Sequence, residues 1–538
     1  MKNKSVVACG VGIVVFVIYA LVVGYFSLPA LNIKSPGFAT FLLIGVIIST
    51  IVSGMIKATD VEDEINLFIA IIPTLLIIVL LIIGAISSAK IFNAKKYAEI
   101  ANIETCEFSD VISASEEVSD IALMDTETAR HFGERTLGEL SDLVSTYDVA
   151  EDYSTINLHG KPMKVAPLEY DSFFKYMKNK ESGIPGYVLV DPVNNTAKYV
   201  KSEKPINYSP SASFGKNLYR RLRNYDLTAI YGTVFFELDE EENMYWIAPV
   251  YNPSIGLYGG KVVDRVVIMD ANTGECKTYK MSDVPSWVDL VIDGDTICQY
   301  YNWYGKLRNG YWNSLFSQTG CFETTDDFGY KTIGDDVYIY TGVTSCNNSQ
   351  SATGFVLANS RTGEMSFMSV TGAEENSAMA AAEGEVSDYG WKASFPSIIN
   401  VNGEPVYLMV LKDDNNIVKR YAMVNIKSYN IVAIDATQKK VLAKYNALIS
   451  GEDIDNEAVS EVVEVEIPED AVTKTITIKS IDFIVSGGET TVYVKSTDGK
   501  IYRSQFDEKW IIYEPQSTVK VTVDADSNQD IVTIYEVQ

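Results

Sequence analysis

Three long runs without a charged residue open the chain. They extend from Ser5 to Ile33, from Ser35 to Ile56 and from Ile65 to Ala89. A helix rises about 1.5 Å per residue, so roughly 20 apolar residues cross a bilayer core of about 30 Å. All three runs reach that length, and the two runs that follow the first argue against a cleaved signal peptide. We therefore predict a three-helix transmembrane anchor over residues 1–96.

The pattern changes twice beyond the third run. Residues 97–162 mix helical spacing with acidic N-cap candidates such as Asp125 or Thr126, and we predict a helical stalk there. Residues 163–448 alternate apolar and polar positions between turns, which indicates strands. Two segments in this region have helical spacing, namely 214–223, with Ser211 or Ser213 as its cap, and 374–384.

One local unit recurs within residues 163–448. A β-branched run ends at Asp or Asn, a short turn follows, and a second run closes with an aromatic residue, in residues 186–199, 266–279, 355–367 and 431–445. Gly274 and Gly363 can supply the positive φ of such a turn, while Asp270 or Asn359 can accept from the backbone ahead of it. The repeats predict an α+β, largely antiparallel β domain with helices over one side of small sheets.

An acidic segment separates this domain from the C-terminus. Residues 449–470 contain nine Asp and Glu and no Lys or Arg, which indicates a linker. Residues 471–538 then show five strongly alternating segments, at 473–479, 490–494, 509–513, 519–523 and 531–535. Five short strands in so short a segment predict a small β-barrel of the SH3 or OB kind.

Charge limits the possible partners and bears on orientation. Residues 1–99 hold 7 Lys and Arg and 5 Asp and Glu of the chain's 44 and 71, so the remainder carries a net charge of −29. Such a surface repels nucleic acid. The short-loop Lys and Arg are nearly balanced, but Lys2 and Lys4 precede the first span, and we predict an inside N-terminus with the C-terminal domain extracytoplasmic.

Several segments resemble a family of uncharacterised multi-pass membrane proteins of Gram-positive bacteria. They are residues 183–188, 216–223, 244–249, 284–289 and 354–359, and the likeness runs from about residue 120 to the C-terminus. The Asp-x-x-Thr-Gly-Glu turns are also similar to those of PepSY-type extracytoplasmic modules. The resemblance implies a location in the cell envelope and brings no assigned activity with it.

Specific catalytic motifs are absent from the sequence. It contains no Gly-x-Ser-x-Gly, no His-Glu-x-x-His, no phosphate-binding loop and no Cys-x-x-Cys. His131 and His159 are its two histidines, and nothing nucleophilic lies beside them in the sequence. The cysteines at 106, 276, 298, 321 and 346 lie beyond the apolar runs, where they form one or two disulfides or remain buried thiols.

Two acidic clusters suggest weaker chemistry. Glu237 and Asp239 begin a run of acids, and paired carboxylates are what a glycosidase uses. A solvated hairpin turn is the favoured explanation, because Asn243 and then a strand from Met244 follow the run. In residues 524–530, oxygen side chains occupy every second position, as in a calcium loop, but the expected glycine and the twelfth-position Glu are missing. The calcium ligands there would be Asp524, Asp526, Asn528 and Asp530.

An aromatic segment and a basic helix are the strongest binding candidates. Residues 299–314 interleave rings with amide and basic side chains, a combination that stacks on sugars or binds proteins, with core packing as the alternative. The basic helix offers a site for an anionic lipid or polymer unless neighbouring acids neutralise it. The candidate binding residues are Tyr301, Trp303, Tyr304, Tyr311, Trp312, Arg220, Arg221 and Arg223.

These features together predict a membrane-anchored, extracytoplasmic binding or scaffolding protein of the bacterial envelope. It would be non-enzymatic and would engage a protein or a wall polymer. The alternative is a carboxylate-based hydrolase of cell-wall polymer, with Glu237 and Asp239 or acids near Trp303 as its catalytic pair. Transport is disfavoured because the apolar runs contain no ionisable residue.

Overall fold

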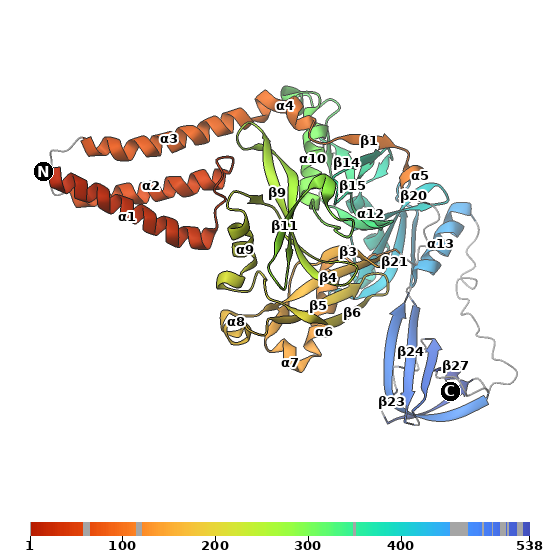
Figure 1. Cartoon of the computed structure of the whole chain (residues 1–538). Coiled ribbons are helices and arrows are strands. Elements are labelled where there is room, and N and C mark those ends of the chain that lie inside the picture. The colour runs from red at the N-terminus through yellow and green to blue at the C-terminus, as the bar shows by residue number, and fades with distance from the viewer. Residues whose placement is uncertain are drawn as a thin grey trace.

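A computed structural model gives the architecture of the chain (Figure 1). It describes residues 2–57, 65–113, 121–325, 327–347, 351–451, 472–486, 489–497, 499–505, 510, 513, 516–523 and 531–537. Four helices come first: α1 (Lys2–Ser27), α2 (Pro36–Lys57), α3 (Ile65–Ser88) and α4 (Lys90–Ala98). The first three project together from one side of a β-rich body, and α4 packs against that body beside α10.

Two of these helices are long and apolar enough to cross a membrane. They are Val7–Ser27 and Pro36–Met55, and both leave most of their apolar side chains uncovered by protein. Leu21 and Phe26, for example, are 69% and 75% exposed, which favours a lipid environment over water. A third crossing requires the end of α3 and α4, which are bent by 51°, to count as one span. The third span therefore stays a prediction.

Four antiparallel sheets form the body. The first contains β2 (Tyr147–Val149), β3 (Ser154–Leu158), β4 (Lys161–Tyr170), β5 (Ile184–Asp191) and β6 (Thr196–Ile206). The second contains β7 (Ile230–Tyr231), β8 (Phe235–Leu238), β9 (Met244–Ile255), β10 (Gly259–Asp270) and β11 (Cys276–Lys280). The fourth contains β18 (Lys392–Ala393), β19 (Ser397–Val401), β20 (Glu404–Lys412), β21 (Val418–Asn425) and β22 (Val432–Asp435).

The third sheet is the largest of the four and includes one parallel edge. Its strands are β1 (Ile103–Cys106), β12 (Phe322–Thr324), β13 (Gly329–Ile333), β14 (Asp336–Ser345), β15 (Ser351–Asn359), β16 (Met365–Met368) and β17 (Gly372–Ala373). Strand β1 pairs in parallel with β16. Successive sheets share hydrophobic cores, so that Phe355 on β15, for example, lies in one cluster with Tyr407 on β20. The largely antiparallel β architecture predicted from the alternation is confirmed.

Three of the four predicted repeats form the expected hairpins, β5–β6, β10–β11 and β15–β16. The turns of the last two share one geometry. Asp270 Oδ1 accepts from two backbone amides ahead of it, and Gly274 has φ +70°. Asn359 Oδ1 does the same, with Gly363 at φ +79°. The turn chemistry read from the sequence is therefore confirmed.

The fourth predicted repeat is wrong. In residues 431–445, β22 leads into the helix α13 (Gln438–Ser450) and not into a second strand. Thr437 caps this helix by accepting from the Lys440 amide, and Val441 and Tyr445, four residues apart, are fully buried. A helical stripe with an N-cap outweighs the superficial likeness to the hairpins.

The predicted helical stalk over residues 97–162 is also wrong, because this segment belongs to the folded body. It supplies strands β1, β2 and β3 together with α5 (Phe108–Val111), α6 (Thr126–Gly138) and α7 (Ser141–Val144). Asp125 is the N-cap of α6, one of the two caps expected, and its carboxylate also pairs with the buried Lys412 on β20. This ion pair joins α6 to the fourth sheet.

The remaining helices cover the sheets. They are α8 (Phe173–Asn179), α9 (Leu218–Tyr225), α10 (Gly294–Leu307), α11 (Tyr311–Leu315) and α12 (Glu375–Glu385), with short 3-10 turns at Phe214–Lys216, Met281–Asp283 and Ser387–Tyr389. Leu218 and Leu222 of α9 are fully buried, as the spacing predicted. The cap of α9 is Asn217, which accepts from the Arg220 amide, and not Ser211 or Ser213. Helix α12 confirms the second predicted helix.

The C-terminal strands form a separate unit. They are β23 (Val472–Ser486), β24 (Glu489–Ser496), β25 (Ile501–Gln505), β26 (Thr518–Val523) and β27 (Ile531–Val537), and they pair in a closed ring. The fully buried Trp510 lies in the core of this ring. The strand expected at 509–513 and the 449–470 linker lie mostly outside the described residues, and β25 is a strand that the sequence did not predict. The likeness to SH3 or OB folds stays a prediction.

Candidate functional site

A pocket of about 610 Å³ lies along one face of α10. Every third or fourth residue of that helix lines it, because those positions share one face of a helix. Residues from α4, α11, β12 and the segments beside them complete the wall. The lining residues are Lys90, Asp295, Cys298, Gln299, Asn302, Trp303, Lys306, Leu307, Tyr311, Ser314, Leu315, Gln318, Glu323 and Cys346.

Local contacts fix α10 in this position. Asp293 caps its N-terminus by accepting from the Thr296 amide at 2.7 Å. Gly305 lies against the backbone of Phe322, where an added Cβ would stand 2.3 Å from the Phe322 oxygen. Only glycine allows the helix to approach β12 this closely.

Polar side chains join α10 to β12 across the pocket floor. Asn302 Nδ2 donates to Thr324 Oγ1 at 3.1 Å, and Asn302 Oδ1 accepts from the Thr324 amide at 2.8 Å. Lys306 forms an ion pair with Glu323. These groups satisfy one another. Ser314 Oγ donates to the Tyr311 carbonyl at 2.7 Å and Gln318 Nε2 donates to the Ser314 carbonyl at 3.5 Å. The pocket therefore offers a ligand the amide of Gln299 and the side-chain oxygens of Ser314 and Gln318.

The predicted aromatic residues divide between the pocket and the core. Trp303 and Tyr311 line the pocket, and Trp303 packs edge-on against Tyr97 with its ring centroid 5.0 Å away. Tyr301 is buried and contributes to a core cluster with Val343, so it does not reach the pocket.

The other two predicted rings lie at the surface beside the pocket. Tyr304 lies under the guanidinium of Arg308. Trp312 is 59% exposed and stacks on Phe316. The aromatic segment is therefore partly core, as the alternative interpretation held, and partly exposed in and beside the pocket.

The electrostatics of the pocket do not favour nucleophilic chemistry. Burial raises the pKa of Cys298 to about 11 and also raises the pKa of Cys346. Both thiols are therefore protonated near neutral pH, and a thiol is a much weaker nucleophile than a thiolate. The carboxylate of Glu323 is paired with Lys306. Among the described lining residues, the arrangement provides rings and hydrogen-bonding groups but no activated nucleophile.

A second pocket, of about 350 Å³, collects most of the acidic run. Glu240, Glu241 and Glu242 line it together with His159, whose Nε2 lies 2.9 Å from the Glu240 carbonyl oxygen. Asp239 caps the turn instead: its Oδ1 accepts from the Glu241 amide and from the Asn243 amide. The acidic run therefore forms a turn in which Glu240, Glu241 and Glu242 are exposed while Asp239 is buried.

Glu237 lies in neither pocket. It is fully buried on β8, and its two carboxylate oxygens accept from the amides of Asp289 and Leu290 at 2.9 and 2.7 Å. Asp289 is itself buried and accepts from the Asn157 amide at 2.7 Å. Since Glu237 is enclosed and Asp239 is occupied by turn amides, this pair does not form an accessible hydrolytic site.

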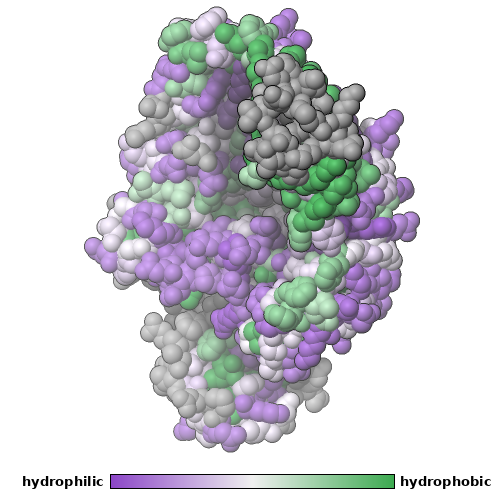
Figure 2. Space-filling model, turned by 90° about the vertical axis from the view of Figure 1, so that its left-hand side faces the viewer, coloured by the Kyte–Doolittle hydropathy of each residue, from purple (hydrophilic) through white to green (hydrophobic). Residues whose placement is uncertain are grey.

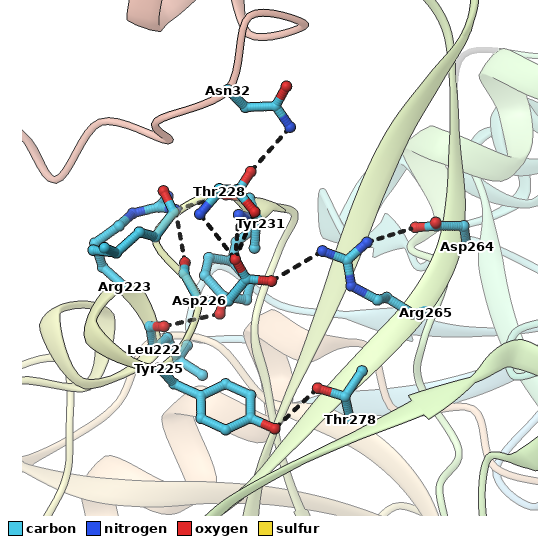
Figure 3. A network of polar contacts seen from close by, with 12 residues as sticks. Asn32, Leu222, Arg223, Tyr225, Asp226, Thr228, Tyr231, Asp264, Arg265 and Thr278 are labelled. Carbon is cyan, nitrogen blue, oxygen red and sulfur yellow. Dashed lines mark hydrogen bonds and ion pairs between the residues drawn. The ribbon is translucent and has the colours of Figure 1, made fainter.

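The basic helix α9 lies at the ends of the apolar helices (Figure 3). Arg223 donates to the carbonyl oxygens of Leu28, Asp226, Leu227 and Ala229. Two more bonds join the segment after α1 to the segment after α9, and we call this contact region the junction. Asn32 donates to the Thr228 carbonyl, and the Leu31 amide donates to the Leu227 carbonyl.

The other two predicted arginines also bond to backbone and not to acids. Arg220 lies over the ring of Tyr25, 3.9 Å from its centroid, and donates to the Tyr25 carbonyl. Arg221 donates to the Gly274 carbonyl at 2.8 Å. Within the described residues, no ion pair involves these three arginines, so neutralisation by neighbouring acids, the default interpretation of this helix, is wrong.

The remaining predicted sites receive less support. All six cysteines are free thiols, and Cys321 and Cys346 lie opposite each other at the end of the β12–β14 pairing. His131 is exposed on α6. The calcium ligands proposed at Asp524, Asp526, Asn528 and Asp530 lie outside the described residues. The described part of the chain contains no group of three His, Cys, Asp or Glu placed to hold a metal ion.

Comparison with known proteins does not identify a relative. No family model matches the chain, and no curated protein matches it. The resemblance to membrane proteins of Gram-positive bacteria therefore stays a prediction, and the function has to be argued from the pockets and surfaces themselves.

Proposed function

We propose that the chain is a membrane-anchored binding protein of the bacterial envelope whose α10 pocket holds a sugar unit of a wall polymer. The observation that carries this proposal is the face of α10, where rings and amides surround a pocket of about 610 Å³. Pockets of this size accommodate small polar ligands or one or two sugar rings. The protein would bind such a ligand without transforming it.

The ligand class follows from the lining groups. Tyr311 offers its ring to the apolar side of a pyranose, and Trp303, which is 8% exposed, offers an edge. The Gln299 amide and the Ser314 oxygen offer hydrogen bonds to the sugar hydroxyls. Two lysines, Lys90 and Lys306, and two acids, Asp295 and Glu323, line the pocket, and Lys306 pairs with Glu323. An uncharged saccharide therefore fits this combination better than a charged ligand does.

The pocket lies close to the membrane helices. Lys90, at the start of α4, belongs to its wall, and α4 follows directly on the apolar helix α3. We propose three membrane spans with the N-terminus inside and the body outside, where a wall polymer would be accessible. The hydrolase alternative would have to use Asp295 and Glu323, the acids near Trp303.

Substitutions in the pocket test the binding proposal. Gln299→Ala and Tyr311→Ala are each expected to weaken saccharide binding about fivefold, because each removes about 1 kcal/mol of hydrogen bonding or stacking. The measurement is calorimetric titration of the full chain in nanodiscs with soluble wall-polymer oligosaccharides. Tyr429→Ala, which removes an exposed tyrosine elsewhere, is the matched control and should bind as the wild type does.

Two results would contradict this proposal. If the wild type bound none of the oligosaccharides, or if both pocket variants bound them unchanged, the pocket would not be the site. If shortened saccharides accumulated in the presence of the wild type, the hydrolase alternative would hold instead, and Glu323→Gln should then abolish their formation.

Protease treatment of whole cells tests the orientation. With an epitope tag at the C-terminus, added protease is expected to remove the tag from intact cells, because the body lies outside in the proposed topology. A cytoplasmic protein of the same cells should remain intact until lysis. Protection of the tag in intact cells, with loss after lysis, would place the body in the cytoplasm.

A further inference from the structure

Helices α8 and α9 lie on the side of the body from which α1 and α2 extend (Figure 1), and three phenylalanines belong to this region. Phe173 and Phe174 begin α8, and Phe214 begins the turn before α9. The ring of Phe173 lies 5.8 Å from that of Phe174 and 6.0 Å from that of Phe214. Phe174 is 82% exposed and the other two are about half exposed. So large an aromatic cluster on an exposed surface indicates an interaction site.

The cluster is held at the level where α1 ends. Arg220 Nη1 donates to the Phe214 carbonyl at 2.6 Å, and its guanidinium also contacts Tyr25 in the last turn of α1. Lys216, two residues after Phe214, donates to the carbonyl of Lys180 at the end of α8. These bonds connect α8, the turn and α9 to the apolar helix, so the rings lie where a membrane helix leaves the bilayer.

The same surface is positively charged within a chain of net charge −27. Residues 173–180 and 214–225 contain seven Lys and Arg and no Asp or Glu. Asp171, Glu181 and Asp226 flank these two ranges, and the charge of Asp226 acts on Arg223. The arginines bond to backbone carbonyls and Lys175 pairs with Asp171, so Lys178 and Lys180 carry the charge that the surface offers to a ligand. Figure 2, which views this side of the molecule, shows apolar patches bordering strongly polar surface.

We propose that the surface formed by residues 173–180 and 214–225, the α8–α9 platform, binds the anionic phospholipid headgroups of the bilayer that holds α1. The three rings insert among the headgroups, and Lys178 and Lys180, the two basic side chains of the platform that are not engaged in the bonds above, contact the phosphates. Rings at the interface with basic residues around them are what an anionic membrane surface attracts. This inference does not depend on the α10 pocket.

A tryptophan at the platform reports its contact with lipid. The full chain carrying Phe174→Trp is placed in nanodiscs of phosphatidylglycerol or phosphatidylcholine with brominated acyl chains, which quench nearby tryptophan. The six native tryptophans are subtracted by measuring the wild type in parallel. In brominated phosphatidylglycerol the added fluorescence should fall by about half or more, since the ring lies at the interface. Tyr429→Trp, in the turn between β21 and β22, is the control and should be unaffected.

Charge reversal tests the role of the lysines. Adding Lys178→Glu and Lys180→Glu to the Phe174→Trp chain should reduce quenching in phosphatidylglycerol at least about twofold, because two attractive charges become repulsive. Lys439→Glu with Lys440→Glu, two exposed lysines on α13, is the matched control and should leave the quenching unchanged.

Each alternative result overturns a stated part of the proposal. Absence of quenching in both lipids would show that the platform does not contact the bilayer. Equal quenching in both lipids would refute the preference for anionic headgroups. Quenching that survives charge reversal would refute the role of the lysines. If the platform instead remained unquenched and bound a soluble protein in cross-linking, it would be a protein interface and the lipid proposal would fail.

Discussion

Raising the pH from about 5 to about 9 is expected to lower the free energy of unfolding of the body, and the buried pair Glu237 and Asp289 is expected to cause most of the loss. Burial and, second to it, the charge of the nearby Glu237 raise the pKa of Asp289 to about 9. Burial likewise raises the pKa of Glu237 to about 8, although the amides of Asp289 and Leu290 oppose the shift. The folded protein therefore retains protons that these carboxyls lose in the unfolded chain.

The sign follows from proton linkage. Between the ordinary carboxyl pKa near 4 and the raised values, the native state binds more protons than the unfolded state, so stability falls as the pH rises. The stabilisation is complete below about pH 4 and is lost as the pH approaches about 9. Each unit by which a pKa is raised in the folded protein corresponds to about 1.4 kcal/mol of stability. Two such units across the pair already give about 3 kcal/mol, and we expect the free energy of unfolding to fall by at least that amount.

A neutral amide separates the contribution of Asp289 from other titrations. Asp289→Asn keeps an oxygen that can accept from the Asn157 amide, but it carries no charge at any pH. At pH 9 the variant should melt about 5 °C or more above the wild type, whereas at pH 5 the two should be nearly equal. Thermal unfolding of the full chain in nanodiscs, followed by near-ultraviolet circular dichroism, gives the comparison.

The control is Asp142→Asn, which removes an exposed carboxylate on α7 and should leave the pH profile of the wild type unchanged. Comparison of the variant with the wild type at each pH is needed because Glu375 also contributes to the pH dependence of stability. Glu375 is buried at the start of α12, its pKa is raised to about 7, and it therefore titrates in the same direction. A variant that melted in parallel with the wild type at all pH values would show that Asp289 is already ionised in the folded protein.

Turn chemistry was the part of the body that the sequence specified best. Asp270 and Gly274 act within five residues of each other, so their effect on the backbone does not depend on the rest of the fold. The failed fourth repeat lacks such a glycine in its turn and has Val441 and Tyr445 at helical spacing instead. The signal that distinguishes helix from hairpin was therefore present in the sequence.

Long-range pairing was not predictable in this way. Residues 103–106 form a strand because they pair with β16, more than 250 positions later in the chain, and no local pattern encodes that partner. The helical interpretation of residues 97–162 therefore captured the Asp125 cap but missed the strands around it. Tertiary contacts override local propensity in short strands of this kind.

The candidate site was predictable as a segment but not residue by residue. The aromatic run was singled out correctly as the place where rings and amides gather, and α10 does form a pocket wall. Which rings face the pocket depends on the rotation of the helix, which the fit of Gly305 against β12 determines. Tyr301 therefore faces the core, while Trp303, two residues later, reaches the pocket.

The contacts of the α9 arginines could not be predicted from the sequence, for a different reason. The sequence indicated an unusual basic cluster, but the groups that it contacts are carbonyl oxygens, and a carbonyl leaves no signature in a sequence. Arg223 satisfies four of them, three at the end of its own helix and one, that of Leu28, beyond the end of α1. One side chain therefore both closes α9 and connects the body to the membrane helices.

Replacing Arg223 by alanine is expected to destabilise the junction by about 3 kcal/mol, because hydrogen bonds from a charged donor are worth about 1.5–3 kcal/mol and four acceptors lose their partner together. Residues 28–35 should then exchange amide hydrogens faster. Hydrogen exchange of the full chain in nanodiscs measures both the loop and α9. Arg221→Ala, which removes a single bond to Gly274 on the same helix, should cost only about 1 kcal/mol and leave residues 28–35 unchanged.

Arg223→Lys tests whether the charge of Arg223 or the geometry of its hydrogen bonds stabilises the junction. Lysine keeps the positive charge but not the planar fork through which Nε reaches Leu28 while Nη1 reaches Ala229. If the fork holds the junction, Arg223→Lys should resemble Arg223→Ala in exchange over residues 28–35. If Arg223→Lys instead exchanged like the wild type, attraction between a cation and the C-terminal carbonyls of α1 would suffice. The body would then be held beside the membrane by charge, and the specific bonds of Arg223 would be secondary.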